Sequence, residues 1–204
     1  VGFATLASLS LFYTKHVTVK LLPFDNKSEL QVVIDLKEGS AVETTDAVAQ
    51  DIARIVLAMP EALSVQTHAA TAAPFNFNGL VRHSYMRSAP YMGDVQINLK
   101  PKGERERSSH DIALDLRERL KAVKLPQGAV LKVVEPPPGP PVMATLLAEI
   151  YGPDAATRRA VAEKVKAAFL SVPFIVDVDD SYGEPAKRLR ATVSTDALEF
   201  FGVQ

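Results

Sequence analysis

Apolar residues recur with two different periods along the first two thirds of the chain. Alternation of apolar and polar residues predicts strands over 30–36, 63–67 and 95–99, and the stretch 128–134, apolar apart from Lys132, adds a fourth. Apolar residues spaced by three and four predict helices over 40–59 and 108–123. Pro60 directly follows the first helix and prevents its continuation. The resulting order is β-α-β-β-α-β.

This order is typical of the ferredoxin-like α+β fold, an antiparallel four-stranded sheet with both helices on one face. We expect the helices to cover an apolar face made of Leu30, Val32, Ile34, Leu63, Val65, Val95 and Ile97. The opposite face, which we expect to meet water or to line a wet cleft, carries Gln31, Asp35, Gln66, His68, Gln96 and Asn98. Ser40 with Glu43, and then Ser108 or Ser109, are predicted to cap the two helices.

A second unit of the same kind begins after a proline-rich connector, Glu135-Pro-Pro-Pro-Gly-Pro-Pro141. Prolines fix φ and lack an N–H, so the connector is predicted to be a stiff extended joint. Beyond it we expect strands over 146–151, 174–178 and 189–193, a helix capped by Asp154, and another helix from Thr195. This unit lacks a closing strand, and we expect the chain to be an excerpt of a longer protein.

The N-terminal residues Val1 to Tyr13 are apolar apart from Thr5, Ser8 and Ser10, and Lys15 and His16 follow. The run is shorter than the about 20 apolar residues that cross a bilayer. We expect the end of a transmembrane helix, and a buried core helix is the alternative. The predicted division is 1–20 for the helix end and membrane exit, 21–141 for the first subdomain with its connector, and 142–204 for the incomplete second subdomain.

Composition and motifs exclude several classes of function. The 204 residues carry a net charge of −1, so nothing indicates general attraction to nucleic acid. The first and third strands also lack the aromatic residues on which RNA-recognition domains stack bases. There is no cysteine, and His16, His68, His83 and His110 lack the spacing of metal ligands. No catalytic motif stands out, so we expect no enzyme, cofactor or bound metal.

A run of mixed charge follows the third strand. Its basic residues are Lys100, Lys102, Arg105 and Arg107, which are interleaved with Glu104 and Glu106. Such alternation predicts a solvated start of a helix rather than a phosphate-binding patch.

The most informative stretch is the irregular segment from Ala69 to Met92. Segments of this length inside a compact domain are usually functional or disordered. It contains Phe75 and Phe77, for which two interpretations remain open. The rings either pack into the local core or form an adaptable apolar surface for cargo.

Several short motifs together resemble one family. In chain order they are Leu22-Pro-Phe-Asp25, Glu38-Gly-Ser40, Phe75-Asn-Phe-Asn-Gly79, Lys100-Pro101, Ile150-Tyr-Gly-Pro153 and the segment Leu198 to Val203. Their order and spacing resemble the C-terminal half of resistance-nodulation-division (RND) efflux permeases. In that family the seventh transmembrane helix leads into two periplasmic porter subdomains of split β-α-β type.

The resemblance implies a proton-driven exporter in the inner membrane, with this segment mostly periplasmic. Such a transporter is a homotrimer that works with a periplasmic adaptor and an outer-membrane channel. In multidrug members, strand and loop residues of this subdomain line the drug pocket. The matching positions here are Phe75, Phe77, Gln66, His68 and Gln96, which implies amphiphilic or drug-like cargo and a rather polar pocket wall.

Two alternatives compete with export of amphiphiles. Copper and silver exporters carry a methionine cluster in this subdomain, but the matching positions here fall near Val33 and Pro137, so metal export is disfavoured. Met86 and Met92 remain as methionines at the loop. The alternative from another class is a soluble tandem ferredoxin-like module that binds a ligand and regulates another protein.

Overall fold

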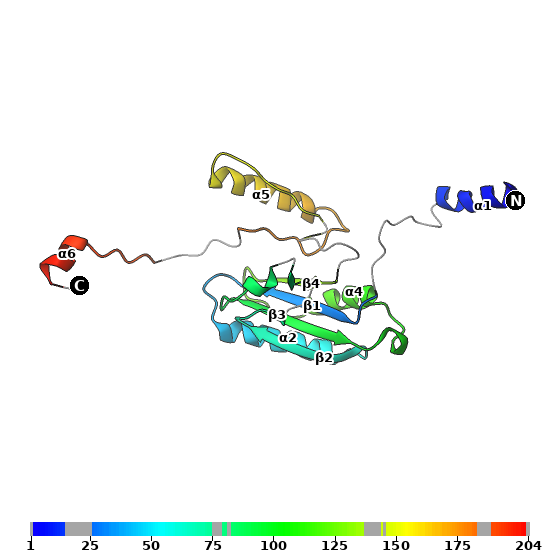
Figure 1. Ribbon diagram of the computed structural model, residues 1–204, viewed down its shortest axis with the longest axis horizontal. Helices are drawn as coiled ribbons and strands as arrows, with labels where there is room; N and C mark the ends of the chain where they lie inside the picture. Colours follow the sequence, from blue (N-terminus) through cyan, green and yellow to red (C-terminus); the bar gives the residue numbers. More distant parts are fainter. Residues whose placement is uncertain are drawn as a thin grey trace.

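The computed structural model describes residues 2–14, 26–74, 79–80, 83–136, 144, 146–182 and 189–202. The elements of the first unit are β1 (Glu29–Asp35), α2 (Val42–Leu57), β2 (Ala62–Ala69), β3 (Met92–Leu99), α4 (Ser109–Leu120) and β4 (Val130–Val134). Two short 3₁₀ helices, η1 (Ser84–Met86) and η2 (Lys102–Glu104), flank β3. Helix α1 (Gly2–Tyr13) precedes this unit, and α5 (Ala155–Leu170) and α6 (Thr195–Phe200) follow it (Figure 1).

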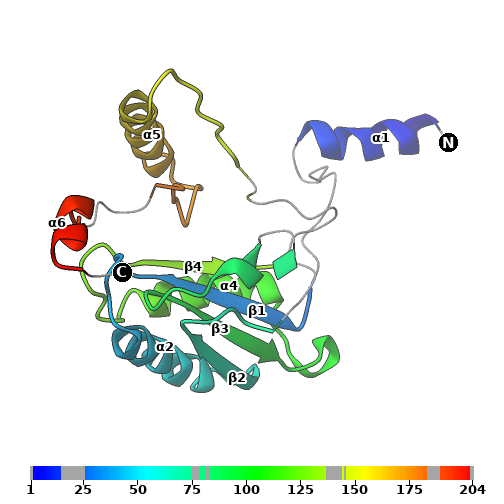
Figure 2. The ribbon, with the colours of Figure 1, turned by 60° about the vertical axis from the view of Figure 1, so that its left-hand side comes forward.

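The four strands form one antiparallel sheet with the order β2-β3-β1-β4. Val32 of β1 is the cross-strand partner of Val95 in β3 and of Val133 in β4. Helix α2 contacts β2 and β3, and α4 contacts β1 and β4, so the two helices cover one face between them (Figure 2). The predicted ferredoxin-like fold is confirmed.

The apolar periodicities meet in a single core between this face and the helices. Its fully buried side chains include Leu30, Val32, Ile34, Val95 and Ile97 from the sheet and Ile52, Val56, Ile112 and Leu116 from the helices. Gly93 lies where α2 approaches the sheet. A Cβ atom there would lie 2.9 Å from Thr45 Cγ2 and 3.1 Å from the His68 carbonyl oxygen, so only glycine permits this close approach.

Leu63 was expected in the core, and this prediction is wrong. The pairing of β2 with β3 shifts by one residue between Ala62 and Ser64, which leaves Leu63 at a bulge. Its side chain is 63% exposed. Beyond the bulge the register is regular, and Val65 returns to the covered face opposite Ile97.

The cap prediction is wrong for α2 and confirmed for α4. The capping box of Ser40 and Glu43 is wrong, because Ala41 occupies the N-cap position and Ser40 Oγ donates to the Lys37 carbonyl oxygen instead (2.7 Å). At α4 the prediction is confirmed. Ser108 Oγ accepts from the Asp111 N–H (3.1 Å), and the Asp111 carboxylate accepts from the Ser108 N–H.

Helix α1 forms where the apolar N-terminal run predicts a helix, and all its side chains are exposed. Among the described residues, no helix combines the length and apolar character needed to cross a bilayer. Lys15 and His16, which were predicted to lie at the membrane surface, are outside the described residues.

The second unit has its predicted helices but not its predicted strands. Helix α5 begins at Asp154, whose Oδ1 accepts from the Thr157 N–H (2.8 Å) as predicted. The described residues of 146–151, 174–178 and 189–193 form no strand, so those predictions are wrong. A strand needs a neighbour for its hydrogen bonds, and no described segment pairs with these three. Residues 137–141 of the connector lie outside the described residues.

Candidate functional site

The sheet face that the helices leave free carries polar side chains in rows across the strands. Gln66 of β2, Gln96 of β3 and Gln31 of β1 are cross-strand partners and form one row. His68 of β2 faces Asp94 of β3 in the next row. Because cross-strand partners project to the same side of a sheet, these five residues share one surface.

The structure describes three of the five predicted cargo-binding residues. Gln66 is exposed, whereas His68 and Gln96 are half-buried. The Nε2 atom of His68 and the Oε1 atom of Gln96 are buried, and neither has a hydrogen-bond partner among the described residues. Phe75 and Phe77 lie outside the described residues.

The segment between β2 and β3 covers the centre of the free face. The Ala73 N–H donates to Asp94 Oδ2 (3.1 Å), and Asp94 has no exposed surface. Gln31, a polar residue on the central strand β1, is also buried. Of the two expectations for this face, contact with water fails at its centre, whereas Gln66 at the β2 edge remains exposed and a cleft stays a prediction.

Arg87 fastens the covering segment to the sheet. Its Nη1 lies 2.7 Å from Asp35 Oδ1, and its Nε lies 3.4 Å from Asp94 Oδ1. Its Nη2 donates to the carbonyl oxygens of Ile34 (2.8 Å) and Gly93 (3.3 Å). A guanidinium can serve several acceptors at once because its donors lie in one planar fork.

The series of charges continues from Asp35 to the edge strand β4. Lys132 Nζ lies 2.8 Å from Asp35 Oδ2 and also forms an ion pair with Asp179, which follows α5 in the chain. Negative and positive groups thus alternate from Asp94 through Arg87, Asp35 and Lys132 to Asp179. We refer to these five residues as the charge ladder.

Burial and ion pairing oppose each other along the charge ladder. Burial raises the pKa of Asp94, and Arg87 offsets only part of this effect. Burial acts in the same direction on Asp35, but Lys132 and Arg87 outweigh it and lower the pKa of Asp35. Burial alone would lower the pKa of Lys132, yet Asp35 and Asp179 raise it. Asp94 is therefore the carboxyl group whose ionisation this site opposes.

Sequence reasoning missed Arg87, Asp94 and Lys132 as members of the site. The alternation had placed Asp35 on the free face, and Asp94 stands two residues before Gln96 on the same face. Buried carboxylates require a partner, because an isolated buried charge is costly. Two acidic residues on a face that a long segment adjoins were therefore a signal to look for a cation such as Arg87 in that segment.

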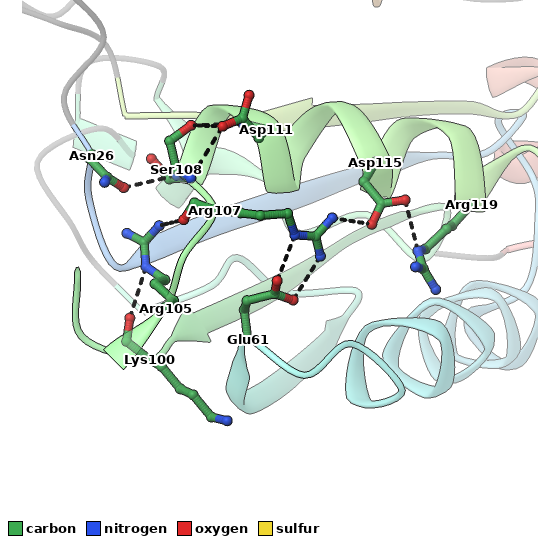
Figure 3. Close-up of polar contacts among 10 residues, drawn as sticks. Asn26, Glu61, Lys100, Arg105, Arg107, Ser108, Asp111, Asp115 and Arg119 are labelled. Atoms are coloured by element: carbon green, nitrogen blue, oxygen red, sulfur yellow. Dashed lines mark hydrogen bonds and ion pairs between the residues drawn. The ribbon is translucent and has the colours of Figure 1, made fainter. Parts of the chain in front are cut away.

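A second polar network lies at the N-terminal end of α4 (Figure 3). Arg107 binds both oxygens of Glu61, with Nε–Oε1 at 2.6 Å and Nη2–Oε2 at 2.8 Å, and its Nη1 lies 2.7 Å from Asp115 Oδ2. The hydrogen bonds from Arg107 lower the pKa of Glu61. These contacts connect α4 to Glu61, which directly precedes β2 and the bulge at Leu63.

Arg105 extends this network to the backbone. It donates to the carbonyl oxygens of Lys100 (3.0 Å), Arg107 (2.7 Å) and Lys27 (2.9 Å). The expectation of a solvated charge run is therefore wrong for Arg105 and Arg107, which tie the β3–α4 connection to its neighbours. Sequence spacing did not predict these contacts. Two of the three carbonyl acceptors of Arg105 are close in the sequence, and the third, that of Lys27, is distant.

Four buried side-chain atoms at the free face have no hydrogen-bond partner among the described residues: His68 Nε2, Gln96 Oε1, Arg87 Nε and Asp94 Oδ1. The last two form an ion pair with each other at 3.4 Å. His68 Nε2 and Gln96 Oε1 are therefore the atoms that a bound molecule could satisfy. In the part of the chain that the structure describes, no three His, Cys, Asp or Glu side chains are grouped so as to hold a metal ion.

Comparison with known proteins agrees with this architecture. A family model described as the AcrB/AcrD/AcrF family matches residues 1–204. Two crystal forms of a heavy metal efflux pump match the whole chain with a TM-score of 0.67 and 18% identity. The chain spans 20% and 21% of the length of those two solved chains. No similarity to a curated protein was detected.

Proposed function

This chain belongs to the AcrB/AcrD/AcrF family of RND efflux permeases, and on that premise we propose that it forms the periplasmic porter part of an inner-membrane exporter of amphiphilic or drug-like compounds. The family assignment favours an exporter over a soluble regulatory module. The chain spans about a fifth of the length of the solved pump chains that it matches. The activity of the whole protein is therefore proposed.

The remaining parts of the proposal follow from the RND resemblance. The exporter would be driven by protons, with the relay carboxylates in other transmembrane helices. It would work as a homotrimer with a periplasmic adaptor and an outer-membrane channel. Residues 1–20 would end a transmembrane helix, and 21–141 and 142–204 would contribute to two porter subdomains.

One observation carries the assignment of the cargo site. His68 Nε2 and Gln96 Oε1 are buried at the free face without a hydrogen-bond partner among the described residues. An unsatisfied buried polar atom costs free energy, and a polar group of a bound molecule would remove that cost. Phe75 and Phe77 belong to the same segment, which Ala73 and Arg87 fix to the sheet on either side of them. Adjacent apolar and polar groups suit an amphipathic molecule.

Replacing Gln96 tests whether its oxygen binds cargo. Methionine has a similar length and lacks the amide, so Gln96→Met should weaken export of cargo with hydrogen-bond donors by roughly two- to tenfold. Gln66→Met on the exposed end of the same row is the matched control, for which we expect a smaller change. If Gln96→Met leaves export of every compound unchanged while the protein becomes more stable, the oxygen is an unsatisfied core atom and not a cargo contact.

Replacing the two phenylalanines tests the apolar part of the site. Each ring contact is worth about 1–3 kcal/mol, so Phe75→Ala with Phe77→Ala should reduce export of amphiphiles by roughly tenfold or more at an unchanged amount of folded protein. A reduced amount of protein would instead place the rings in the core. Unchanged protein and unchanged export would contradict the assignment of these residues.

Metal ions are a useful alternative cargo in the same assays. The matched solved structures are of a heavy metal efflux pump, but identity of 18% supports a common fold and not a common cargo. Of the methionines near the site, Met86 is largely exposed. We expect the whole protein that contains this chain to confer resistance to amphiphiles and none to copper or silver salts. Resistance to the salts that disappears in Met86→Leu with Met92→Leu would overturn the proposed cargo class.

A further inference from the structure

Strand β4 is an edge of the sheet, and its outer side is occupied by side chains. The Val133 N–H donates to Asp177 Oδ2 (3.3 Å), and the Val133 carbonyl oxygen accepts from Arg117 Nη2 (2.8 Å). These are backbone groups with which an added strand would pair. Arg117 comes from α4 of the first unit, whereas Asp177 comes from the segment after α5 in the second.

The two side chains at this edge also bind each other. Arg117 Nε lies 3.2 Å from Asp177 Oδ2, and the side chains are only 16% and 25% exposed. Arg117 also pairs with Glu135, whose Oε1 lies 3.4 Å from Arg117 Nη1. The other oxygen of Glu135, Oε2, lies 2.9 Å from His110 Nδ1. The position of the guanidinium is therefore fixed by the first unit, independently of Asp177.

Asp177 adopts an uncommon backbone conformation in order to make this contact. Its φ is 55°, in the left-handed region that few residues other than glycine occupy. Aspartate is among the residues that tolerate it best. A strained residue persists where surrounding contacts hold it, and here the carboxylate is held by Arg117 and by the Val133 N–H.

A second ion pair lies beside the first. Asp179 pairs with Lys132, the neighbour of Val133 in β4, and Lys132 also contacts Asp35 of the charge ladder. The segment after α5 thus presents two carboxylates, at 177 and 179, to two cations of the first unit. All of these contacts are made by side chains or by one backbone N–H. They can therefore break without disrupting the sheet.

We propose that Arg117 and Lys132 form a latch that fastens the second unit to the β4 edge through Asp177 and Asp179, and that the latch opens and closes during the working cycle of the protein. We call these four residues the edge latch. The contacts of the closed latch do not depend on the proposed cargo. The proposal that the latch opens rests on the proposed export function. Lys132 of the edge latch also contacts Asp35, which pairs with Arg87. Opening or closing the edge latch would therefore change the ion pairs next to the proposed cargo face.

The test uses the whole protein that contains this chain, into which cysteine pairs are introduced. Lys132→Cys with Asp179→Cys, and independently Arg117→Cys with Asp177→Cys, should be cross-linked by a bis-methanethiosulfonate reagent, whose spacer takes the place of the long side chains that are in contact when the latch is closed and whose two disulfides can be reduced. The sequence has no cysteine of its own that would compete within this segment. We expect the cross-linked protein to lose export and to regain it when the disulfides are reduced.

Lys166→Cys with Asp180→Cys provides the matched control. These side chains are in contact at 2.9 Å but both belong to the second unit. This pair should cross-link equally well and leave export unchanged. Each single cysteine variant removes one contact of the latch, so its export is compared with and without the cross-linking reagent, and we expect the reagent to make no difference.

Two results would overturn the edge latch. Failure of both pairs to cross-link, while the control pair does, would mean that the second unit does not lie against β4. Full export by the cross-linked protein would mean that the contact is permanent and never opens. If the unmodified protein exports no amphiphile at all, the proposed function fails, yet the yield of cross-linked protein still reports whether the latch closes.

Discussion

The first and second units begin with similar sequence patterns and have different structures. Residues 29–134 fold into a four-stranded sheet whose apolar face is covered by α2 and α4. In the described residues from 146 onward, Ala162 is the buried apolar side chain, and Val161 and Leu170 of α5 are 40% and 64% exposed. Apolar periodicity therefore predicts an element, but burial depends on whether another element is present to cover it.

The difference between helices and strands has a simple physical origin. A helix makes its backbone hydrogen bonds within one segment, so α5 and α6 form from local sequence and from caps such as Asp154 and Ser194. A strand makes them with a neighbour. Residues 174–178 have the alternation of a strand but, in the described part of the chain, no neighbour with which to pair.

The largest expected contrast between the units is in the cost of a cavity. Ile52 is fully buried in the first unit, so Ile52→Ala should lower the free energy of unfolding by about 2–5 kcal/mol. Val161→Ala on the half-exposed face of α5 should change it by less than about 0.5 kcal/mol. Denaturant unfolding monitored by circular dichroism measures both. Similar losses would show that the second unit is covered in solution.

Removing one charge from the ladder should have the next largest effect, and the effect should depend on pH. Asp35→Asn should cost about 1.5–3 kcal/mol at pH 7, because Arg87 and Lys132 lose a charged acceptor. The pKa of Asp35 is lowered from its ordinary value of 3.8, so the stability it contributes is present above pH 3.8 and is lost as pH falls through the folded-state pKa. The difference from the unmodified protein should therefore shrink below about pH 4.

Asp94→Asn is the matched control, with the opposite sign. The pKa of Asp94 is raised above 3.8, so its contribution favours folding below pH 3.8 and is lost as pH rises through the folded-state pKa. Neutral asparagine should therefore be tolerated at pH 7, with a small or favourable change in stability. Unfolding curves between pH 3 and 8 distinguish the two variants. An Asp94→Asn variant that is less stable than Asp35→Asn at pH 7 would contradict this assignment of the charges.

A smaller effect is expected where α2 approaches the sheet. Gly93→Ala would place a methyl group against Thr45 and the His68 carbonyl, and should destabilise the first unit by about 1–3 kcal/mol. Gly103→Ala is the control, because nothing lies within 4 Å of a Cβ atom there. Thermal unfolding of the pair measures the difference. Equal stability would mean that α2 can shift away from β3 at little cost.

The smallest effect compares the caps of the two units. Ser108→Ala should cost about 1 kcal/mol, and its loss should appear in the cooperative unfolding of the first unit, because α4 belongs to the core. Asp154→Ala removes a similar cap from α5 but should leave that transition unchanged. Hydrogen exchange of the two helices separates a local from a global effect. A shift of the main transition by Asp154→Ala would indicate that the units unfold together.

The sequence predicted what depends on local pattern and failed where distant residues decide. Alternation placed Val32 and Ile34 in the core and Gln96 on the free face, as observed. It could not reveal that the pairing shifts at Leu63, since this depends on the partner strand. Nor could it reveal that Arg87 returns to Asp35, 52 residues earlier in the chain. The assignment of Phe75 and Phe77 to the cargo site stays a prediction.

The bulge at Leu63 has a consequence for how copies of this protein meet one another. It lies on β2, the edge opposite β4, where an unbroken strand could recruit the same strand of another molecule. A bulge increases the local twist and interrupts the regular spacing of donors and acceptors. We therefore expect the irregularity to hinder strand-to-strand association of neighbouring molecules, and a variant that restores regular pairing there to self-associate more readily.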